Sequence, residues 1–268
     1  MTSAPSWYRS LGPAGGAPLR WLAGWGRIVW LGAVLLVLAL SPSSYGRPRM
    51  RAALARHLYL DTAPILLGFT LLCALLTLVI TRIVVVTAAS YGLSQYALEM
   101  VIRVLVLELI PLTAALFVAL RCTIPNGAAL ADMRRSGHFT ELQGRGLHPL
   151  AVEVLPRMLA GLFSVVTLAA LSCAVAIVLA YLAVYGPTPA GLPAYTRVFG
   201  RIFNPSVSLI FVLKTLFFSL AVSIIPLASA LHDGDAGGSR ESAALQGLVR
   251  MFAVLLLLEA VSLMGNYI

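Results

Sequence analysis

Six charged side chains lie inside or near long apolar runs of the sequence, where ionisable residues are rare. They are Arg82, Glu99, Arg103, Glu108, Lys214 and Glu259. An unpaired charge at the centre of a membrane helix costs about 2.5–3.5 kcal/mol on insertion scales, so such residues face the protein interior and find partners. Glu99 and Arg103 are four residues apart and can pair on one helical face. We expect Glu108, Lys214 and Glu259, from three different runs, to form a buried cluster, which either lines a polar path or only holds helices together.

No catalytic or cofactor motif accompanies these charges. The sequence contains no HExxH, no GxSxG elbow and no GxxxxGK[ST] phosphate loop. Its histidines are scattered at or outside the ends of the apolar runs, and Cys73, Cys122 and Cys173 have no metal-binding spacing. We therefore expect no metal ion, no cofactor and no enzymatic activity. Any uphill movement would draw its energy from a partner ATPase or from an ion gradient.

The composition identifies the elements that must position the charges. The chain has 268 residues, of which 60% are hydrophobic and 11% charged, and its mean hydropathy is +0.93. Soluble chains are about 25% charged and about 45–50% apolar, so a soluble enzyme is excluded and an all-α integral membrane protein is predicted. Five runs are long enough, or nearly so, to cross a bilayer as helices: 63–88, 97–120, 158–184, 207–230 and 248–264.

Residues 1–57 precede these runs and form a segment that we expect at the cytoplasmic membrane surface. Its apolar run, 28–40, is too short to cross and follows Trp and Arg residues that suit the headgroup layer. This segment carries seven arginines and no acid, and the 121–157 loop carries five arginines, whereas the 185–206 connection carries two. The positive-inside rule then places the N-terminus in the cytoplasm and the C-terminus outside. The net charge of +9 needs no nucleic acid to explain it.

The 121–157 segment is the largest internal connection between the predicted spans. Leu130, Met133, Phe139 and Leu142 include pairs three residues apart, which share a helical face. This spacing favours a short amphipathic helix that lies against a partner, whereas several glycines favour an ordinary solvated loop. Periodicity alone leaves both interpretations open.

An ordered set of short motifs runs from Arg56 to the C-terminus. Arg56-His57-Leu58-Tyr59 matches R-x-L-Y, Glu108-Leu109-Ile110-Pro111 matches E-L-G-P, Arg121 matches the arginine of a G-R pair, and Met133-Arg134, Pro149 and Pro156-Arg157 match M-R, D-P and P-R marks. Lys214 and Glu259 match a lysine of the fourth span and an acid of the last. In this order and spacing the chain resembles the MlaE/YrbE permeases, membrane subunits of ABC transporters that carry lipids between membranes with a substrate-binding MCE protein.

The resemblance implies a dimer in which each half has an N-terminal interfacial helix and a permease domain, here residues 58–268, with five spans. The internal loop would hold a coupling helix that docks into the ATPase, formed by Leu130, Met133, Arg134, Phe139 and Leu142. The dimer would enclose an outward-open apolar lipid cavity. The charges at the base of this cavity would be Glu108, Lys214, Glu259 and Arg103.

The resemblance also implies partners and a location. These are a separate ABC ATPase, an MCE-type protein, a small STAS-type cytoplasmic subunit, phospholipid as the substrate, and the bacterial inner membrane, where such transporters serve outer-membrane lipid homeostasis. Departures such as Leu107, Ile110, Ala129 and Ala131 leave the lipid and the choice between homodimer and heterodimer open. The alternatives are an ion-coupled secondary transporter and a non-transporting membrane subunit.

Overall fold

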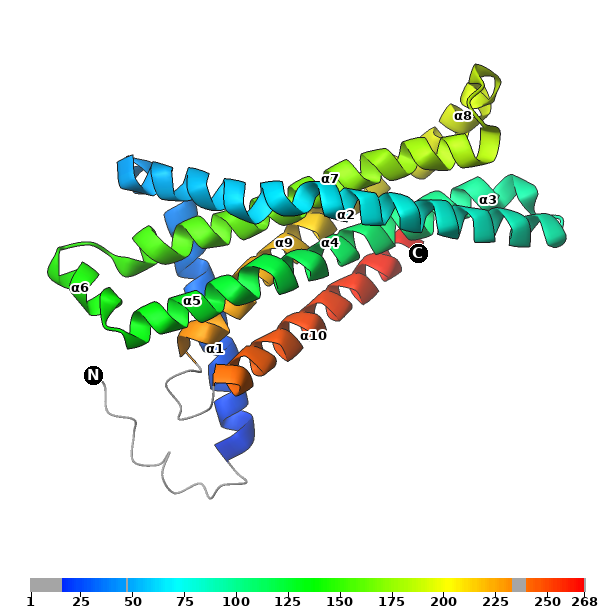
Figure 1. Cartoon of the computed structure of the whole chain (residues 1–268). Helices are drawn as coiled ribbons and strands as arrows, with labels where there is room; N and C mark the ends of the chain where they lie inside the picture. The colour runs from blue at the N-terminus through cyan, green and yellow to red at the C-terminus, as the bar shows by residue number, and fades with distance from the viewer. Residues whose placement is uncertain (1–15, 47, 233–239, 268) are drawn as a thin grey trace.

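The computed structural model describes residues 16–46, 48–232 and 240–267, and all of the regular structure in this part of the chain is helical (Figure 1). The elements in chain order are α1 (Gly16–Leu40), η2 (Pro42–Tyr45), α2 (Pro48–Ser90), α3 (Ser94–Val101), η3 (Ile102–Leu109), α4 (Ile110–Val118), η4 (Ala119–Thr123), α5 (Ile124–Arg135), α6 (His138–Gly144), η5 (Leu150–Val154), α7 (Leu155–Tyr185), η6 (Pro189–Gly191), α8 (Leu192–Ile202), α9 (Pro205–His232) and α10 (Arg240–Tyr267).

The all-helical membrane fold predicted from the composition is confirmed. Among the described residues six helices are long and apolar enough to cross a membrane, and five of them contain the five predicted runs. The helices extend past the runs that predicted them: α2 covers Pro48–Ser90 around the 63–88 run. This extension is expected, because a helix satisfies its own backbone hydrogen bonds whether or not its side chains are apolar.

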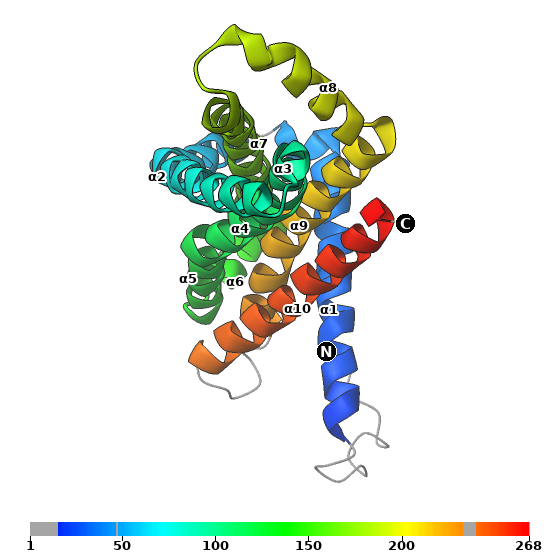
Figure 2. The ribbon, with the colours of Figure 1, turned by 90° about the vertical axis from the view of Figure 1, so that its right-hand side faces the viewer.

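The sixth helix is α1, which is longer than the apolar run inside it. It has 25 residues, and its part Leu22–Leu40 is long and apolar enough to cross a membrane. In Figures 1 and 2, however, α1 runs across the common direction of α2, α4, α5 and α7. The predicted interfacial position of this segment stays a prediction, but the expectation that its apolar helix is too short to cross is corrected, because α1 extends the apolar run on its N-terminal side.

The second predicted span belongs to one uninterrupted helix, Ser94–Arg135, which is wound in two places as a π-helix. These places are η3 and η4, and η5 forms a third π segment at the start of α7. In a π turn each N–H bonds to the carbonyl five residues back, as the N–H of Ile110 does with Leu105. π-Helical segments are rare in proteins, and those that occur often lie at functional sites.

The long helices pack through small residues. The hydroxyls of Thr62 on α2 and Ser164 on α7 are hydrogen-bonded at 2.7 Å. At Gly161 on α7 a Cβ atom would lie 2.9 Å from both Ser223 Oγ on α9 and Thr123 Cγ2 on η4. Only glycine therefore allows α7, α9 and the second span to approach so closely, as is typical of helix contacts in membranes.

The 185–206 connection was expected as a short link and contains an additional helix, α8. Pro193 lies in its first turn, where a proline needs no N–H partner, so the prolines that end α7 also permit a new helix to begin. The hydroxyl of Tyr195 donates to the Ile177 carbonyl of α7 at 2.8 Å, and burial raises the pKa of Tyr195 to about 12. The connection is thus held against the end of the bundle.

Candidate functional site

Glu108, Lys214 and Glu259 come together from η3, α9 and α10. The Lys214 ammonium donates to Glu108 Oε2, and it lies 2.8 Å from Glu259 Oε2. The Lys214 side chain is 2% exposed, and those of Glu108 and Glu259 are 10% and 14% exposed. The predicted cluster is therefore present as one buried ion network that joins three helices.

The local backbone of η3 supplies a further acceptor to this network. Pro111 has no N–H, so it cannot bond to the carbonyls four and five residues back, those of Leu107 and Val106. The Lys214 ammonium donates to the Leu107 carbonyl at 3.3 Å, and the thiol of Cys173 donates to the Val106 carbonyl at 3.4 Å. Lys214 thus donates hydrogen bonds to Glu108 and to the Leu107 carbonyl, whereas Glu259 Oε2, which accepts no hydrogen bond in the described structure, contacts it as an ion pair.

The electrostatics of the network depend on its single cation. With all three groups ionised, two carboxylates share one ammonium, and the cluster carries a net negative charge inside an apolar bundle. The Phe218 ring, whose centroid is 5.6 Å from Lys214 Nζ, adds a weak attraction to the cation. Loss of one carboxylate contact leaves the other in place, so the network can rearrange without exposing an unpaired lysine.

Arg103 forms its ion pair with a residue outside this cluster. Its Nε donates to Glu99 Oε1 at 3.0 Å, which confirms the predicted pair of residues four apart. Both residues line a cavity of about 650 Å³ between the end of α2 and α3, with an almost wholly apolar lining. The placement of Arg103 among the basal charges thus stays a prediction, and the structure gives this arginine a different neighbour from Lys214.

The internal segment predicted to couple to an ATPase is helical, as α5 and α6, with Gly137 between them at a φ of +80°. Leu130 is fully buried and Leu142 is 7% exposed, and Met133 and Phe139 pack against the same core. These side chains contact the chain's own helices, and their predicted part in binding an ATPase stays a prediction.

Arg134, the fifth predicted coupling residue, also turns toward the chain itself. Its Nη1 donates to the carbonyl of Leu231 at the end of α9. The exposed side chains of α6 include Thr140, Glu141 and Gln143. Arg134 is exposed as well, so a partner at this end of the bundle could meet it together with those residues.

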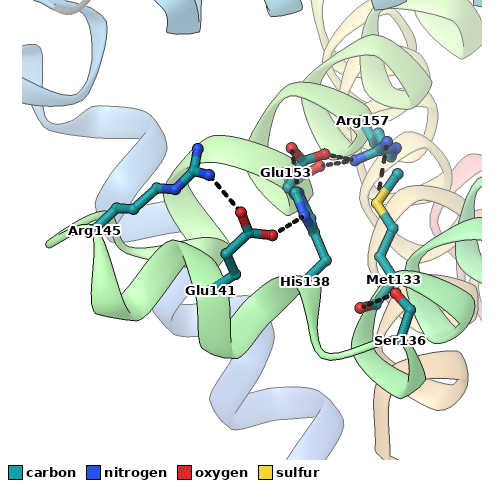
Figure 3. A network of polar contacts seen from close by, with 7 residues as sticks. All are labelled: Met133, Ser136, His138, Glu141, Arg145, Glu153 and Arg157. Atoms are coloured by element: carbon teal, nitrogen blue, oxygen red, sulfur yellow. Dashed lines mark hydrogen bonds and ion pairs between the residues drawn. The ribbon is translucent and has the colours of Figure 1, made fainter.

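A chain of polar contacts links α6 to the beginning of the third span (Figure 3). Arg145 Nη2 lies 2.5 Å from Glu141 Oε1, and Glu141 Oε2 lies 3.6 Å from His138 Nδ1. His138 Nε2 lies 3.8 Å from Glu153 Oε1, and Arg157 Nη1 donates to Glu153 Oε2 at 2.7 Å. Arg157 is buried, so the inner end of this chain is protected from solvent.

Asp61 forms a second buried polar contact that the sequence patterns did not single out. It is 9% exposed, and Asn126 Nδ2 on α5 donates to its Oδ2 at 2.9 Å. The thiol of Cys122 donates to the Asp61 carbonyl at 3.3 Å. In the sequence Asp61 is an acid two residues before the first predicted span. That position is typical of a residue at the membrane–water boundary, so the sequence did not indicate burial.

The fold and the site define a multi-pass helical membrane protein with a buried ion network and no soluble domain among the described residues. The family model described as Permease MlaE matches residues 54–264, and the chain belongs to this family. No curated protein matches the chain. The family is one of ABC-type permeases, so the chain is a membrane transport subunit rather than an enzyme.

Proposed function

We propose that the chain is the membrane subunit of an ABC transporter that moves phospholipid, or a related lipid, between the inner membrane and an MCE-type protein. Membership of the MlaE permease family supports the assignment to transport proteins. The observation that carries the proposal further is the buried network of Glu108, Lys214 and Glu259, which joins the second, fourth and last spans through one ammonium. Relative movement of these spans must break or exchange its contacts.

In this proposal the network is a reversible lock between two arrangements of the helices. Lys214 holds η3 through Glu108 and Leu107, and it holds α10 through Glu259. A transport cycle driven by nucleotide binding would separate one of these contacts while the other keeps the lysine paired. Two arrangements of similar free energy are what a ligand or a partner can shift by differential binding.

The apolar cavity beside Glu99 and Arg103 is the proposed place for an acyl chain. Its volume of about 650 Å³ falls within the roughly 300–1,000 Å³ range of ligand sites, and its lining is dominated by side chains such as Ile83, Val84 and Met100. An apolar wall accepts a hydrocarbon chain without an unpaired polar group. The Glu99–Arg103 pair supplies opposite charges next to it, which suits a zwitterionic headgroup.

The proposed orientation puts the N-terminus in the cytoplasm and the C-terminus in the periplasm. Figure 1 supports it, because the beginning of α2 and the arginine-rich α5–α6 segment lie at the same end of the bundle, while α3 and α8 lie at the other. A separate ABC ATPase, and in some assemblies a STAS-type subunit, would bind at the first end. The MCE-type protein would bind at the second.

The test is affinity purification from native membranes in mild detergent, with mass spectrometry of co-purifying proteins and lipids. We expect an ABC ATPase, an MCE-type protein and bound phospholipid, and the same data show whether one or two kinds of permease chain are present. Purification of the chain without an ATPase would contradict the proposal. It would leave an ion-coupled transporter, for which the buried carboxylates are the supporting observation, or a non-transporting subunit.

A further inference from the structure

The polar contacts between α6 and the third span form a path from the surface into the core (Figure 3). The exposed fractions of the side chains fall along it, from 64% for Arg145 and 54% for Glu141 to 39% for His138, 21% for Glu153 and 8% for Arg157. The first residues of the path lie in or directly after α6, whereas the last two lie in η5 and in the first turn of α7. The path therefore connects the exposed surface of α6 to the buried beginning of the third span.

Glu153 is the point of this path at which two helices meet, because its two carboxylate oxygens have different partners. Oε2 accepts a hydrogen bond from Arg157 Nη1 at 2.7 Å, and Oε1 lies 3.8 Å from His138 Nε2. One carboxylate thus contacts α7 through one oxygen and α6 through the other. A displacement of α6 relative to η5 acts directly on the group that Arg157 holds.

Arg157 also binds the backbone of η5 at the place where the π-helical winding ends. The N–H of Leu155 bonds to the Leu150 carbonyl five residues back, and Pro156, which follows, has no N–H to continue this pattern. Arg157 Nη1 donates to the Glu153 carbonyl at 2.6 Å. Because π turns are rare, a side-chain bond at their junction with an α-helix helps to determine which of the two windings is adopted.

The same guanidinium contacts the helix that precedes α6. Arg157 Nη2 lies 3.8 Å from Met133 Sδ on α5. The guanidinium is therefore held between α5, which comes before α6 in the chain, and η5, which comes after it. A buried arginine with fixed partners on both sides is well placed to keep the two ends of the internal segment in one arrangement.

We propose that Arg157 is a positioning residue for the third span. Through Glu153 it holds η5 in the π-helical winding, and a displacement of α6 reaches this winding through His138. A change from the π to the α winding moves the start of α7 by about one residue, which is about 1.5 Å along the helix axis and about 100° of rotation. This role rests on the proposed function, in which an ATPase binds at the α6 end and its movement is passed to the spans.

The first test is amide hydrogen exchange of the full chain in nanodiscs, which requires neither an ATPase nor transport. In Arg157→Gln we expect the amides of residues 150–157 to exchange roughly tenfold faster or more, the value of one hydrogen bond to a charged group. His138→Leu cuts the contact with α6 but leaves Arg157 on Glu153, so it should speed exchange in α6 and leave η5 unchanged.

The second test uses the complex with its ATPase in vesicles and measures lipid transfer and ATP hydrolysis on the same sample. We expect Arg157→Gln and His138→Leu to lower the lipid transferred per ATP hydrolysed by roughly fivefold or more, the lower end of usual coupling free energies. Arg157→Lys keeps the cation and should restore part of this ratio. A merely structural role would lower both rates together and leave their ratio unchanged.

Arg145→Gln is the matched control for both tests. It removes the exposed arginine at the outer end of the path, which pairs with Glu141 and does not contact Glu153. We expect it to keep the exchange rates of η5 and the ratio of lipid to ATP.

Unchanged exchange of η5 in Arg157→Gln would overturn the proposal, and so would an unchanged ratio of lipid to ATP in His138→Leu. The second variant decides the matter if Arg157→Gln does not assemble, because His138 is partly exposed and its replacement leaves the buried pair intact. Absence of ATP-dependent transfer in the wild-type complex would contradict the proposed function instead. The exchange experiment would then still show whether Arg157 fixes η5.

Discussion

Replacement of Lys214 by methionine removes the one cation of the buried network. Methionine has a similar length and fills the same space, so the change leaves little cavity and acts mainly through charge. It leaves Glu108 and Glu259 facing each other and takes one donor from the Leu107 carbonyl. Removal of one partner from a buried ion pair costs about 3–5 kcal/mol. We expect Lys214→Met to lower the free energy of unfolding by about this amount and to abolish lipid transport.

The triple variant Glu108→Gln/Lys214→Met/Glu259→Gln separates the two effects. It has no uncompensated buried charge, and replacement of a whole buried ion network by neutral groups is often close to neutral for stability. We expect its free energy of unfolding, measured by detergent titration in mixed micelles, to return toward that of the wild type. Its ATP-dependent transfer of labelled phospholipid between vesicles should remain absent, because the lock cannot rearrange.

Arg103 offers a matched control, because it lies on η3 with Glu108 but pairs with Glu99. Arg103→Met breaks a pair with Glu99 whose side chains are 27% and 23% exposed, and such pairs contribute at most about 1 kcal/mol. Its stability should therefore change little. If the triple variant recovers both stability and lipid transfer, the three charges only hold helices together, and the proposed role of the network in transport is refuted.

The remaining predictions concern packing. Gly161→Ala places a methyl group 2.9 Å from Ser223 Oγ, so it should lower the thermal unfolding temperature, with a cost of about 1–3 kcal/mol, whereas Gly144→Ala meets no atom within 4 Å and should leave it unchanged. Leu130→Ala should cost about 2–5 kcal/mol and loosen the α5–α6 segment, measured as faster amide hydrogen exchange there; unchanged exchange would contradict its place in the core. Arg145→Ala breaks an exposed pair and should lower stability by less than about 1 kcal/mol in a thermal unfolding assay.

The sequence contains enough information for the membrane fold and for the ion network. Apolar length predicts the spans, because every backbone group in lipid must be satisfied within a helix. The high cost of a charge in lipid predicts that Glu108, Lys214 and Glu259 pair with one another, and the structure brings them together. Family motifs place Lys214 and Glu259 in order, but no motif states which carboxylate approaches which ammonium.

Other parts of the site depend on tertiary contacts that a periodic pattern does not encode. The spacing of Leu130 and Met133 identifies an apolar face, but it does not say whether a partner or the chain's own helices cover that face. Pro111 gives no N–H to the Leu107 and Val106 carbonyls of η3, and only the tertiary contacts of Lys214 and Cys173 satisfy them. Asp61 resembles a boundary residue in sequence, and only the approach of α5 buries it.

The most direct test of the central claim is lipid transfer by the reconstituted transporter. The chain, purified with the ATPase and MCE-type protein that we expect, is placed in vesicles, and movement of a labelled phospholipid is followed with ATP, with a non-hydrolysable analogue, and with a proton gradient alone. The proposed function predicts transfer that requires ATP hydrolysis and is lost in Lys214→Met. Transfer driven by the proton gradient without nucleotide would contradict it and would assign the buried carboxylates to an ion-coupled transporter.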